Sequence, residues 1–356
     1  MEKSVIEKNM IKKYKFGICG AFDFEEKGTG GQSVKTREFY FALRNAVGKN
    51  KIAIIESTGY KANPISFFFK MISLIRNCED VIIFPANKGI KIFAPMCTFF
   101  APKYRTRIHY NVIGGWLPKL VKENLGLKRC LLKFNTILVE TSTMKRELEE
   151  QGFSNIYRLV NFKQLVPVTE VKAVSEPVRL CYFSRVAKHK GIEDAVKVVG
   201  RINKNKISCI FDIYGPVVPD YEKDFQKIQK SFGNGITYKG KIDPKDSVKT
   251  ITQYDLQLFP TLYDTEGIPG SIVDSYFAGT PVVAAKWNSF SDVIKDSMTG
   301  IGYEQHNVND FYRKLSAIIT QPEEIMKMKQ NCLREAEKYK PEVVIEQFLH
   351  IIGNLN

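Results

Sequence analysis

The sequence of 356 residues predicts an α/β protein made of two doubly wound domains. Short apolar runs with the length of buried strands alternate with amphipathic runs of helical period in both halves of the chain. Such alternation is typical of parallel sheets that are covered by helices on both faces. A segment with two prolines and no helical period separates the two halves, and the chain is long enough for two domains of ordinary size.

The first half begins with a predicted strand, a glycine-containing loop and a helix. Gly30 and Gly31 precede this helix, and Gln32 begins it, so the backbone there could approach a ligand closely. A flexible turn is an equally good interpretation of these glycines. The predicted strands are residues 15–21, 51–56, 81–85, 107–113, 136–141 and 156–160, and the predicted helices are residues 32–45, 67–76, 90–100 and 142–151.

The second half repeats this pattern without repeating the sequence. Its predicted strands are residues 179–184, 207–214, 236–239, 256–259 and 282–285, and its predicted helices include residues 192–202, 311–319, 323–337 and 342–352. We therefore expect a first domain at residues 1–165, a linker at 166–178, a second domain at 179–340, and a C-terminal helix at 341–356 that crosses back to the first domain. Two open α/β domains joined in this way would face each other across a ligand-binding cleft.

Residues 255–285 predict a strand, a loop, a helix and a second strand. The first strand stops at Pro260, and a polar loop leads to Glu266. Pro269 suits the first position of a helix, because its φ is preset and its missing N–H is not needed there. Gly279 suits the end of that helix, and Pro281 follows it. Because ligands bind at the carboxyl ends of parallel strands, the loop with Glu266 is a candidate site.

The predicted helix start could bind an anion between two carboxylates. Gly270, Ser271 and Ile272 would offer backbone N–H groups at the positive end of the helix. Glu266 precedes these residues, and Asp274 lies about one turn into the helix, away from its apolar face. The alternative is that Glu266 is an ordinary loop residue and Asp274 a solvated helix residue.

Two cations follow the first strand of the second domain, in the motif S-R-V-A-K-H-K-G. Arg185 and Lys190 arise at the same sheet edge as Glu266, so all three side chains could converge. A guanidinium and an ammonium together can neutralise a diphosphate, although either alone is often a solvated surface cation. Departure of a nucleoside diphosphate from a sugar is chemistry that needs this combination, because negative charge builds up on the leaving group.

Most of the net charge of +15 belongs to the first half of the chain. Residues 1–175 contain 29 Lys and Arg against 15 Asp and Glu, a net charge of +14. Nucleic acid, an anionic membrane surface or a polyanionic substrate could each match this charge, and no nucleic-acid-binding motif accompanies it. The seven scattered cysteines indicate a reduced, cytoplasmic protein, and neither a signal peptide nor a membrane span is predicted.

The two motifs together resemble retaining glycosyltransferases of family 4. The resemblance rests on S-R-x-x-K-x-K-G and on E-G-I-P-G-S-I-V-D-S-Y-F-A-G-T-P-V-V-A, and G-G-W-L-P-K-L-V-K-E-N-L in the first half is similar to capsule and exopolysaccharide transferases of that family. It implies the GT-B fold, with two Rossmann-like domains facing a cleft. The resemblance implies that Arg185 and Lys190 bind the diphosphate and that Glu266 contacts the donor sugar. It also implies that Asp274, in place of the usual Glu, binds the ribose, and that the N–H groups of Ser271 and Ile272 bind the phosphates. The residues implied to close over the donor from the first domain are Gly30, Gly31 and Gln32.

The resemblance also implies partners and conditions. Such enzymes work without a divalent cation or other cofactor, and their first domain binds an acceptor at the inner face of the membrane. A first-domain histidine near the sugar is common among them, and His109 could be that residue or a satisfied histidine within a strand. Residues 63–76 combine aromatic and basic side chains and could lie on a membrane surface, or could form an ordinary core helix.

We therefore expect a cytoplasmic, peripherally membrane-associated hexosyltransferase that acts in cell-surface polysaccharide biosynthesis. It would transfer a sugar from a UDP- or GDP-sugar to a glycan or a polyprenyl-diphosphate-linked acceptor. The alternatives are a nucleotide-sugar epimerase or hydrolase on the same fold, a catalytically silent partner subunit, and a basic nucleic-acid-binding protein.

Overall fold

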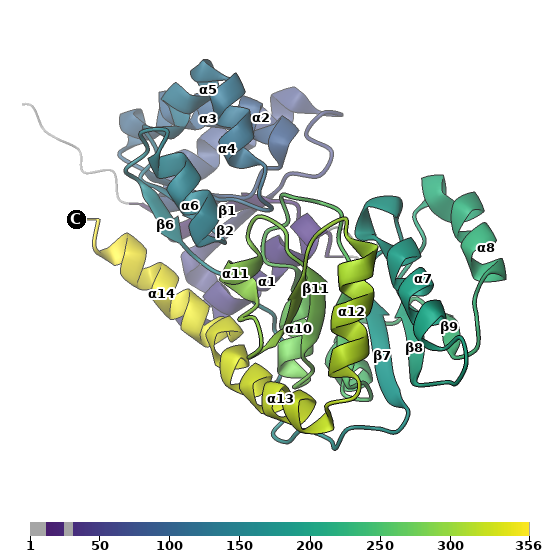
Figure 1. Ribbon diagram of the computed structural model, residues 1–356. Helices are drawn as coiled ribbons and strands as arrows, with labels where there is room; N and C mark the ends of the chain where they lie inside the picture. Colours follow the sequence, from purple (N-terminus) through teal and green to yellow (C-terminus); the bar gives the residue numbers. More distant parts are fainter. Residues whose placement is uncertain (1–11, 25–30, 356) are drawn as a thin grey trace, which may run out of the picture. The chain divides into compact units, whose positions relative to one another are not determined.

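The computed structural model describes residues 12–24 and 31–355, which divide into two compact units (Figure 1). Unit 1 contains the described residues up to Val139, together with Glu147–Arg158 and the end of the chain from Gln347. Unit 2 contains Glu140–Arg146 and Leu159–Glu346. Each unit is built on its own parallel sheet, as the alternation of strands and helices predicts.

The sheet of unit 1 has six parallel strands in the order β2-β1-β3-β4-β5-β6. The strands are β1 (Tyr14–Gly20), β2 (Ile52–Glu56), β3 (Cys78–Ile83), β4 (Arg107–Asn111), β5 (Thr136–Val139) and β6 (Ile156–Arg158). The central strands β3, β4 and β5 are buried almost throughout. Near-continuous burial is what helices on both faces of a parallel sheet produce.

Helices of unit 1 pack on this sheet and on one another. They are α1 (Gly31–Val47), α2 (Pro64–Asn77), α3 (Asn87–Tyr104), α4 (Leu117–Glu123) and α5 (Leu125–Leu131). Helix α6 (Ser142–Glu149) starts in unit 2 and ends in unit 1, and so does α14 (Pro341–Gly353). Phe348 of α14 packs against Phe39 of α1 with ring centroids 5.0 Å apart, so the end of the chain is part of the unit 1 core.

Unit 2 has a second six-stranded parallel sheet, in the order β12-β11-β10-β7-β8-β9. Alternate residues of its strands feed two separate cores: Leu180 and Tyr182 of β7 belong to one, and Cys181 between them belongs to the other. The sheet is therefore covered on both faces. The strands are β7 (Val178–Phe183), β8 (Cys209–Tyr214), β9 (Ile236–Gly240), β10 (Leu256–Phe259), β11 (Val282–Ala285) and β12 (Gly300–Tyr303).

The helices of unit 2 divide between these two cores. Residues of α7, α8 and α12 pack into the core that contains Leu180, and residues of α9, α10 and α11 pack into the core that contains Cys181. Helix α13 contributes to both. The helices are α7 (Ile192–Ile202), α8 (Glu222–Lys230), α9 (Ser247–Ile251), α10 (Gly270–Phe277), α11 (Phe290–Val293), α12 (Val308–Ile318) and α13 (Pro322–Ala336).

A buried ion pair fastens the segment before β7 to unit 2. Lys329 of α13 lies 2.7 Å from Asp255 and donates a second hydrogen bond, of 3.1 Å, to the carbonyl of Lys172. The other carboxylate oxygen of Asp255 accepts the N–H groups of Ser175 and Arg179. Both charged groups of this pair are thus hydrogen-bonded to more than one partner, as a buried charge requires.

The predicted α/β fold is confirmed, with differences in detail. Helices α4, α5, α8, α9 and α11 and strand β12 were absent from the predicted elements, because helices of nine residues or fewer and a four-residue strand with two glycines carry little periodicity. Pro269 is not the first residue of α10 but precedes it in an extended conformation, at φ −66° and ψ 126°. Gly279 follows the helix at φ 63°, as expected for a helix end.

Candidate nucleotide-sugar site

The order of strands in unit 2 creates a switch point between β7 and β10. These strands are neighbours in the sheet although more than 70 residues separate them in sequence. The chain leaves β7 towards β8 on one side and returns through β10 on the other, so the loops after Phe183 and after Phe259 diverge at the same sheet edge. In open α/β sheets this is where a ligand binds. Sequence alone could not provide this order.

Gly191 lets the two loops approach each other closely. It has φ +70°, and a Cβ placed on it would lie 1.7 Å from the carbonyl oxygen of Pro260. The 3-10 turn Lys188–Lys190 therefore rests directly against the end of β10, and Leu262 N–H donates a 2.9 Å hydrogen bond to the carbonyl of His189. The glycine that ends the motif K-H-K-G is thus needed for a close backbone approach.

This approach places Lys190 beside Glu266. The ammonium group of Lys190 makes an ion pair with Oε1 of Glu266, and the hydroxyl of Thr261 donates to the same oxygen at 3.1 Å. The Lys190 and Glu266 side chains are 11% and 13% exposed, so both are largely shielded yet reachable from solvent. Lys190 also lies 5.8 Å from the ring centre of Phe259. The structure brings these two predicted residues together.

Arg185 stands apart from this pair. It is exposed, and its side chain makes no ion pair with any residue that the structure describes. Its backbone carbonyl accepts a 2.9 Å hydrogen bond from the hydroxyl of the buried Tyr182, which fixes the start of the loop. The guanidinium group is therefore on the same sheet edge as Lys190 but is not held there by a partner.

The start of α10 offers two N–H groups rather than three. Among the described residues, no acceptor contacts the N–H groups of Gly270 and Ser271. The N–H of Ile272, by contrast, donates to the carbonyl of Pro269 at 3.0 Å. Pro269 stays outside the helix and accepts this hydrogen bond, so the N–H of Ile272 is engaged in this structure, and its binding to a phosphate stays a prediction.

Glu140 and Asn161 hold the loop that carries Glu266. The buried carboxylate of Glu140 accepts the N–H of Ile268 at 2.8 Å, and Nδ2 of Asn161 donates to the carbonyl of Ile268 at 3.1 Å. Both peptide groups flanking Ile268 are thus fixed, two residues from Glu266. Neither residue was among those predicted, because each lies far from the loop in sequence and belongs to no motif.

Asp274 is buried, so the interpretation as a solvated helix residue is wrong. Burial raises the pKa of its carboxyl group, and the nearby ammonium of Lys163 opposes that rise. Nζ of Lys163 lies 3.6 Å from Oδ1 of Asp274 and next to Gly270, where a Cβ would come within 3.1 Å of the lysine side chain. Lys163 is therefore a further cation at the start of α10, which no sequence motif indicated.

His109 lies inside the sheet of unit 1. Its side chain is 0% exposed, with Nε2 3.0 Å from Asp80 and Nδ1 2.9 Å from the hydroxyl of Thr136. Burial lowers the pKa of His109, and the neighbouring Asp80 carboxylate only partly opposes this. Since both ring nitrogens are engaged and no ring atom reaches solvent, we interpret His109 as a structural histidine and not as the predicted catalytic residue.

The predicted first-domain loop is only partly described. Gly30 lies outside the described residues. Gly31 is the exposed first residue of α1, and Gln32 donates a 2.8 Å hydrogen bond to the carbonyl of Phe84 at the end of β3. Closure of these residues over a donor stays a prediction.

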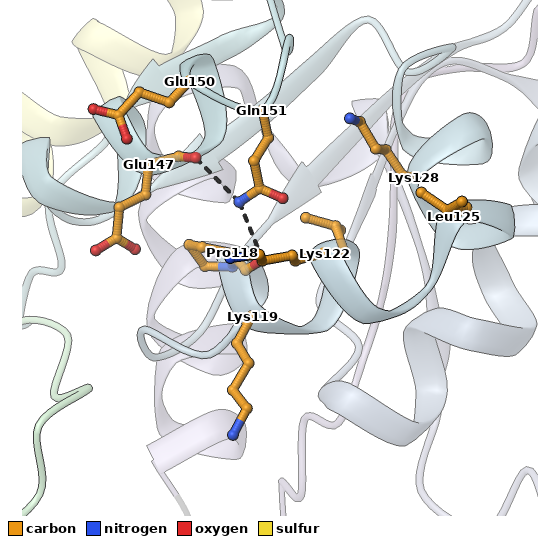
Figure 2. A pocket seen from close by; sticks show the side chains of 9 residues that line it. Pro118, Lys119, Lys122, Leu125, Lys128, Glu147, Glu150 and Gln151 are labelled. Carbon is orange, nitrogen blue, oxygen red and sulfur yellow. Dashed lines mark hydrogen bonds between the residues drawn. The ribbon is translucent and has the colours of Figure 1, made fainter.

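A separate cleft of about 570 Å³ lies between α4, α5 and α6 in unit 1 (Figure 2). Gln151 closes one side of it with hydrogen bonds to the carbonyls of Pro118 and Glu147. The walls mix three lysines with two glutamates, a lining that favours no single charge on a ligand. The residues around the cleft are Pro118, Lys119, Val121, Lys122, Leu125, Lys128, Glu147, Glu150 and Gln151, none of which is a predicted site residue.

Two doubly wound units, one with a cation–carboxylate pair at its switch point, give this chain the fold of the GT-B glycosyltransferases. Residues 169–335 match the family Glycosyl transferases group 1. This segment, which contains Arg185, Lys190 and Glu266, is somewhat less than half of the chain.

Two known proteins are similar over more of the chain. A poly(ribitol-phosphate) α-N-acetylglucosaminyltransferase of Staphylococcus aureus is 25% identical over 359 residues, which cover 95% of this chain and 67% of that protein. An uncharacterized glycosyltransferase of Methanocaldococcus jannaschii is 22% identical over 190 residues, covering 51% of this chain and 47% of the relative. The chain thus spans about half the length of this second relative.

Among solved structures, HepE of Anabaena in complex with UDP and glucose is similar with a TM-score of 0.73 and 11% sequence identity. The match covers 96% of this chain and 100% of HepE. At this identity the similarity establishes the fold, and it extends through both units.

Proposed function

We propose that this protein is a retaining glycosyltransferase that transfers a sugar from a UDP- or GDP-sugar to a glycan or polyprenyl-diphosphate-linked acceptor in cell-surface polysaccharide biosynthesis. One observation carries the proposal: Lys190 and Glu266 are paired at the switch point of unit 2, next to the start of α10. A cation there can stabilise a departing diphosphate, and the carboxylate can bind sugar hydroxyl groups.

The leaving group would be bound by two charges and two N–H groups. Negative charge grows on the diphosphate as the bond to the sugar breaks, so interactions with it strengthen in the transition state. Lys190 is partly shielded from water, which makes its charge more effective, and the exposed Arg185 is free to approach the outer phosphate. Gly270 and Ser271 would add N–H groups at the positive end of α10.

The carboxylates would bind hydroxyl groups. Glu266 accepts hydrogen bonds from Thr261 and Lys190 on one oxygen, Oε1, so its other oxygen can accept one from the donor sugar. Oδ1 of Asp274 is buried and makes no hydrogen bond with a described residue, although the ammonium of Lys163 lies 3.6 Å away as its ion-pair partner. A ribose hydroxyl would supply the missing hydrogen bond. The shorter side chain of Asp274, one methylene less than Glu, limits how far it can reach.

The acceptor is inferred from charge and from the named relative. The net charge of +14 in residues 1–175 would attract an anionic acceptor, such as a lipid diphosphate or a phosphate-containing glycan. The Staphylococcus aureus relative is named for a poly(ribitol-phosphate) acceptor, which has this character. We further propose that transfer needs no divalent cation, because Lys190 and Arg185 supply positive charge for the diphosphate.

A transfer assay tests the proposal. Purified protein is incubated with UDP- and GDP-sugars and with membranes as the acceptor source, with and without a chelator, and the anomeric configuration of the product is determined by NMR. We expect transfer with retention, undiminished by the chelator and abolished in Glu266→Gln. Asp264→Asn, an exposed acid in the same loop, is the matched control and should remain active.

Three results would contradict the proposal. Full activity of Glu266→Gln would show that the site is elsewhere. Consumption of the donor without any acceptor product would favour a hydrolase or epimerase, and inactivity with every donor, together with no nucleotide binding, would favour a silent subunit.

A further inference from the structure

Four phenylalanine side chains form a cluster on the surface of unit 1, which we call the aromatic face. It consists of Phe68 and Phe69 on α2 and Phe99 and Phe100 on α3. The rings of Phe68 and Phe100 meet edge to face with centroids 5.7 Å apart, and each contacts its neighbour on its own helix. Phe69 is 65% exposed and Phe99 is 73% exposed. Exposed apolar clusters of this kind mark interaction sites more often than isolated surface residues do.

The core of unit 1 does not account for these side chains. Helix α2 buries Phe67, Met71 and Leu74 on its inner side, and α3 buries Ile90, Phe93 and Cys97. The aromatic face lies on the other side of both helices, where the exposed Ile65 and Ile92 extend it. Each helix therefore has a second apolar stripe that the fold itself leaves uncovered.

Basic residues accompany the aromatic face, on helices that contain no acidic residue. Helices α2, α3 and α5 pack side by side at one end of unit 1 (Figure 1), and their 39 residues include no Asp or Glu. Most of their cations are exposed. The basic residues are Lys70, Arg76, Lys88, Lys91, Lys103, Lys128 and Arg129.

We propose that the aromatic face docks on the surface of an anionic lipid bilayer. Aromatic and aliphatic side chains would enter the boundary between headgroups and acyl chains, while the surrounding lysines and arginines contact lipid phosphates. A soluble polyanion would match the charge but leaves the phenylalanines in water, and a protein partner would have to be acidic to match these helices. No helix among the described residues is long and apolar enough to cross a membrane, so the contact is with the surface.

Vesicle binding by the full chain tests this inference, which depends on this face alone and not on the proposed transfer reaction. Vesicles of phosphatidylcholine alone and of phosphatidylcholine with phosphatidylglycerol are sedimented with the protein at low and high salt. Binding should require phosphatidylglycerol and weaken as salt is added. The double variant Phe69→Ser/Phe99→Ser should reduce the affinity for anionic vesicles at least about tenfold. The double variant Lys70→Gln/Lys91→Gln should reduce it roughly thirtyfold, because each cation contributes about one kcal/mol.

Matched control variants test whether binding depends on this face or on exposed apolar and basic side chains in general. Ile207→Ser/Met298→Ser removes two exposed apolar side chains of unit 2, and Lys204→Gln/Lys206→Gln removes two exposed lysines there. Both controls should bind vesicles like the parent chain, and every variant should keep its melting temperature and its affinity for UDP. Retained UDP affinity shows that a failure of membrane binding leaves the donor site intact.

Several outcomes would overturn the inference. Equal binding of neutral and anionic vesicles, or full binding by the Phe69→Ser/Phe99→Ser variant, would exclude this face as a lipid contact. A dimer that forms without vesicles and is lost in the same variant would show that a second copy covers the face. Binding to soluble polyphosphate that is unaffected by the phenylalanine substitutions, with no binding to vesicles, would assign the charge to a soluble polyanion.

Discussion

Replacing Gly191 with alanine should damage both stability and nucleotide binding. The new methyl group would lie 1.7 Å from the carbonyl oxygen of Pro260, and the residue would have to keep φ at +70°. A left-handed conformation costs a non-glycine residue about 1–2 kcal/mol. Overlap with a backbone atom must be relieved by moving one of the two loops, which costs roughly another 1–3 kcal/mol.

We therefore expect Gly191→Ala to lower the free energy of unfolding by about 2–5 kcal/mol. For a unit of this size this corresponds to a melting temperature lower by roughly 4–20 °C. Because the movement separates the Lys188–Lys190 turn from the end of β10, UDP affinity should also fall. Differential scanning fluorimetry and titration calorimetry measure the two effects.

Gly200→Ala is the matched control. Gly200 lies within α7, and a Cβ there would meet no atom within 4 Å. Since alanine favours a helix by about 1 kcal/mol over glycine, this variant should be slightly more stable than the parent chain and bind UDP equally well. If Gly191→Ala instead melts like the parent chain and binds UDP normally, the close approach does not hold the site together.

Three further predictions concern residues outside the proposed nucleotide contacts. Lys329→Met should lower the free energy of unfolding by about 3–5 kcal/mol, because it leaves the buried carboxylate of Asp255 without its ion-pair partner. Chemical denaturation measures this free energy. If the effect is as small as that of Lys327→Met, which removes an exposed lysine, the prediction is contradicted. Glu140→Ala should reduce kcat about tenfold or more, because it releases the N–H of Ile268. Glu140→Gln should keep most of the activity, because its amide oxygen can still accept that hydrogen bond. An equal loss of kcat in both variants would refute this positioning role. Burial lowers the pKa of His109, so the unfolded chain takes up a proton that the folded chain does not, and stability should fall as pH drops below about 6.5. His109→Gln should show a smaller fall in melting temperature between neutral pH and pH 5 than the exposed-histidine control His350→Gln, and an unchanged fall would contradict this.

The sequence predicted the two α/β halves because buried strands and amphipathic helices differ in period and length. It also predicted Lys190 and Glu266, because parallel strands place their following loops at one edge. It could not show that these two residues are in contact, since this depends on β7 and β10 being neighbours in the sheet.

The contacts of several candidate residues could not be predicted, for local physical reasons. Proline fixes φ but not ψ, so the sequence does not decide whether Pro269 is helical or extended. It is extended, and its carbonyl accepts the N–H of Ile272. His109 is satisfied by Asp80 and Thr136, on the neighbouring strands on either side of it, and no pattern within β4 reveals either partner. Glu140, Asn161 and Lys163 are recruited by tertiary structure alone.

The central claim is that Lys190 binds the diphosphate of a nucleotide donor in unit 2. Titration calorimetry of UDP and GDP against the parent chain, Lys190→Ala and Lys188→Ala tests it directly, since Lys188 is an exposed lysine in the same turn. Loss of one charge-assisted contact should weaken binding of the preferred nucleotide by roughly tenfold to a hundredfold in Lys190→Ala, with little change in Lys188→Ala. Equal affinity of the parent chain and Lys190→Ala for that nucleotide would contradict the assignment.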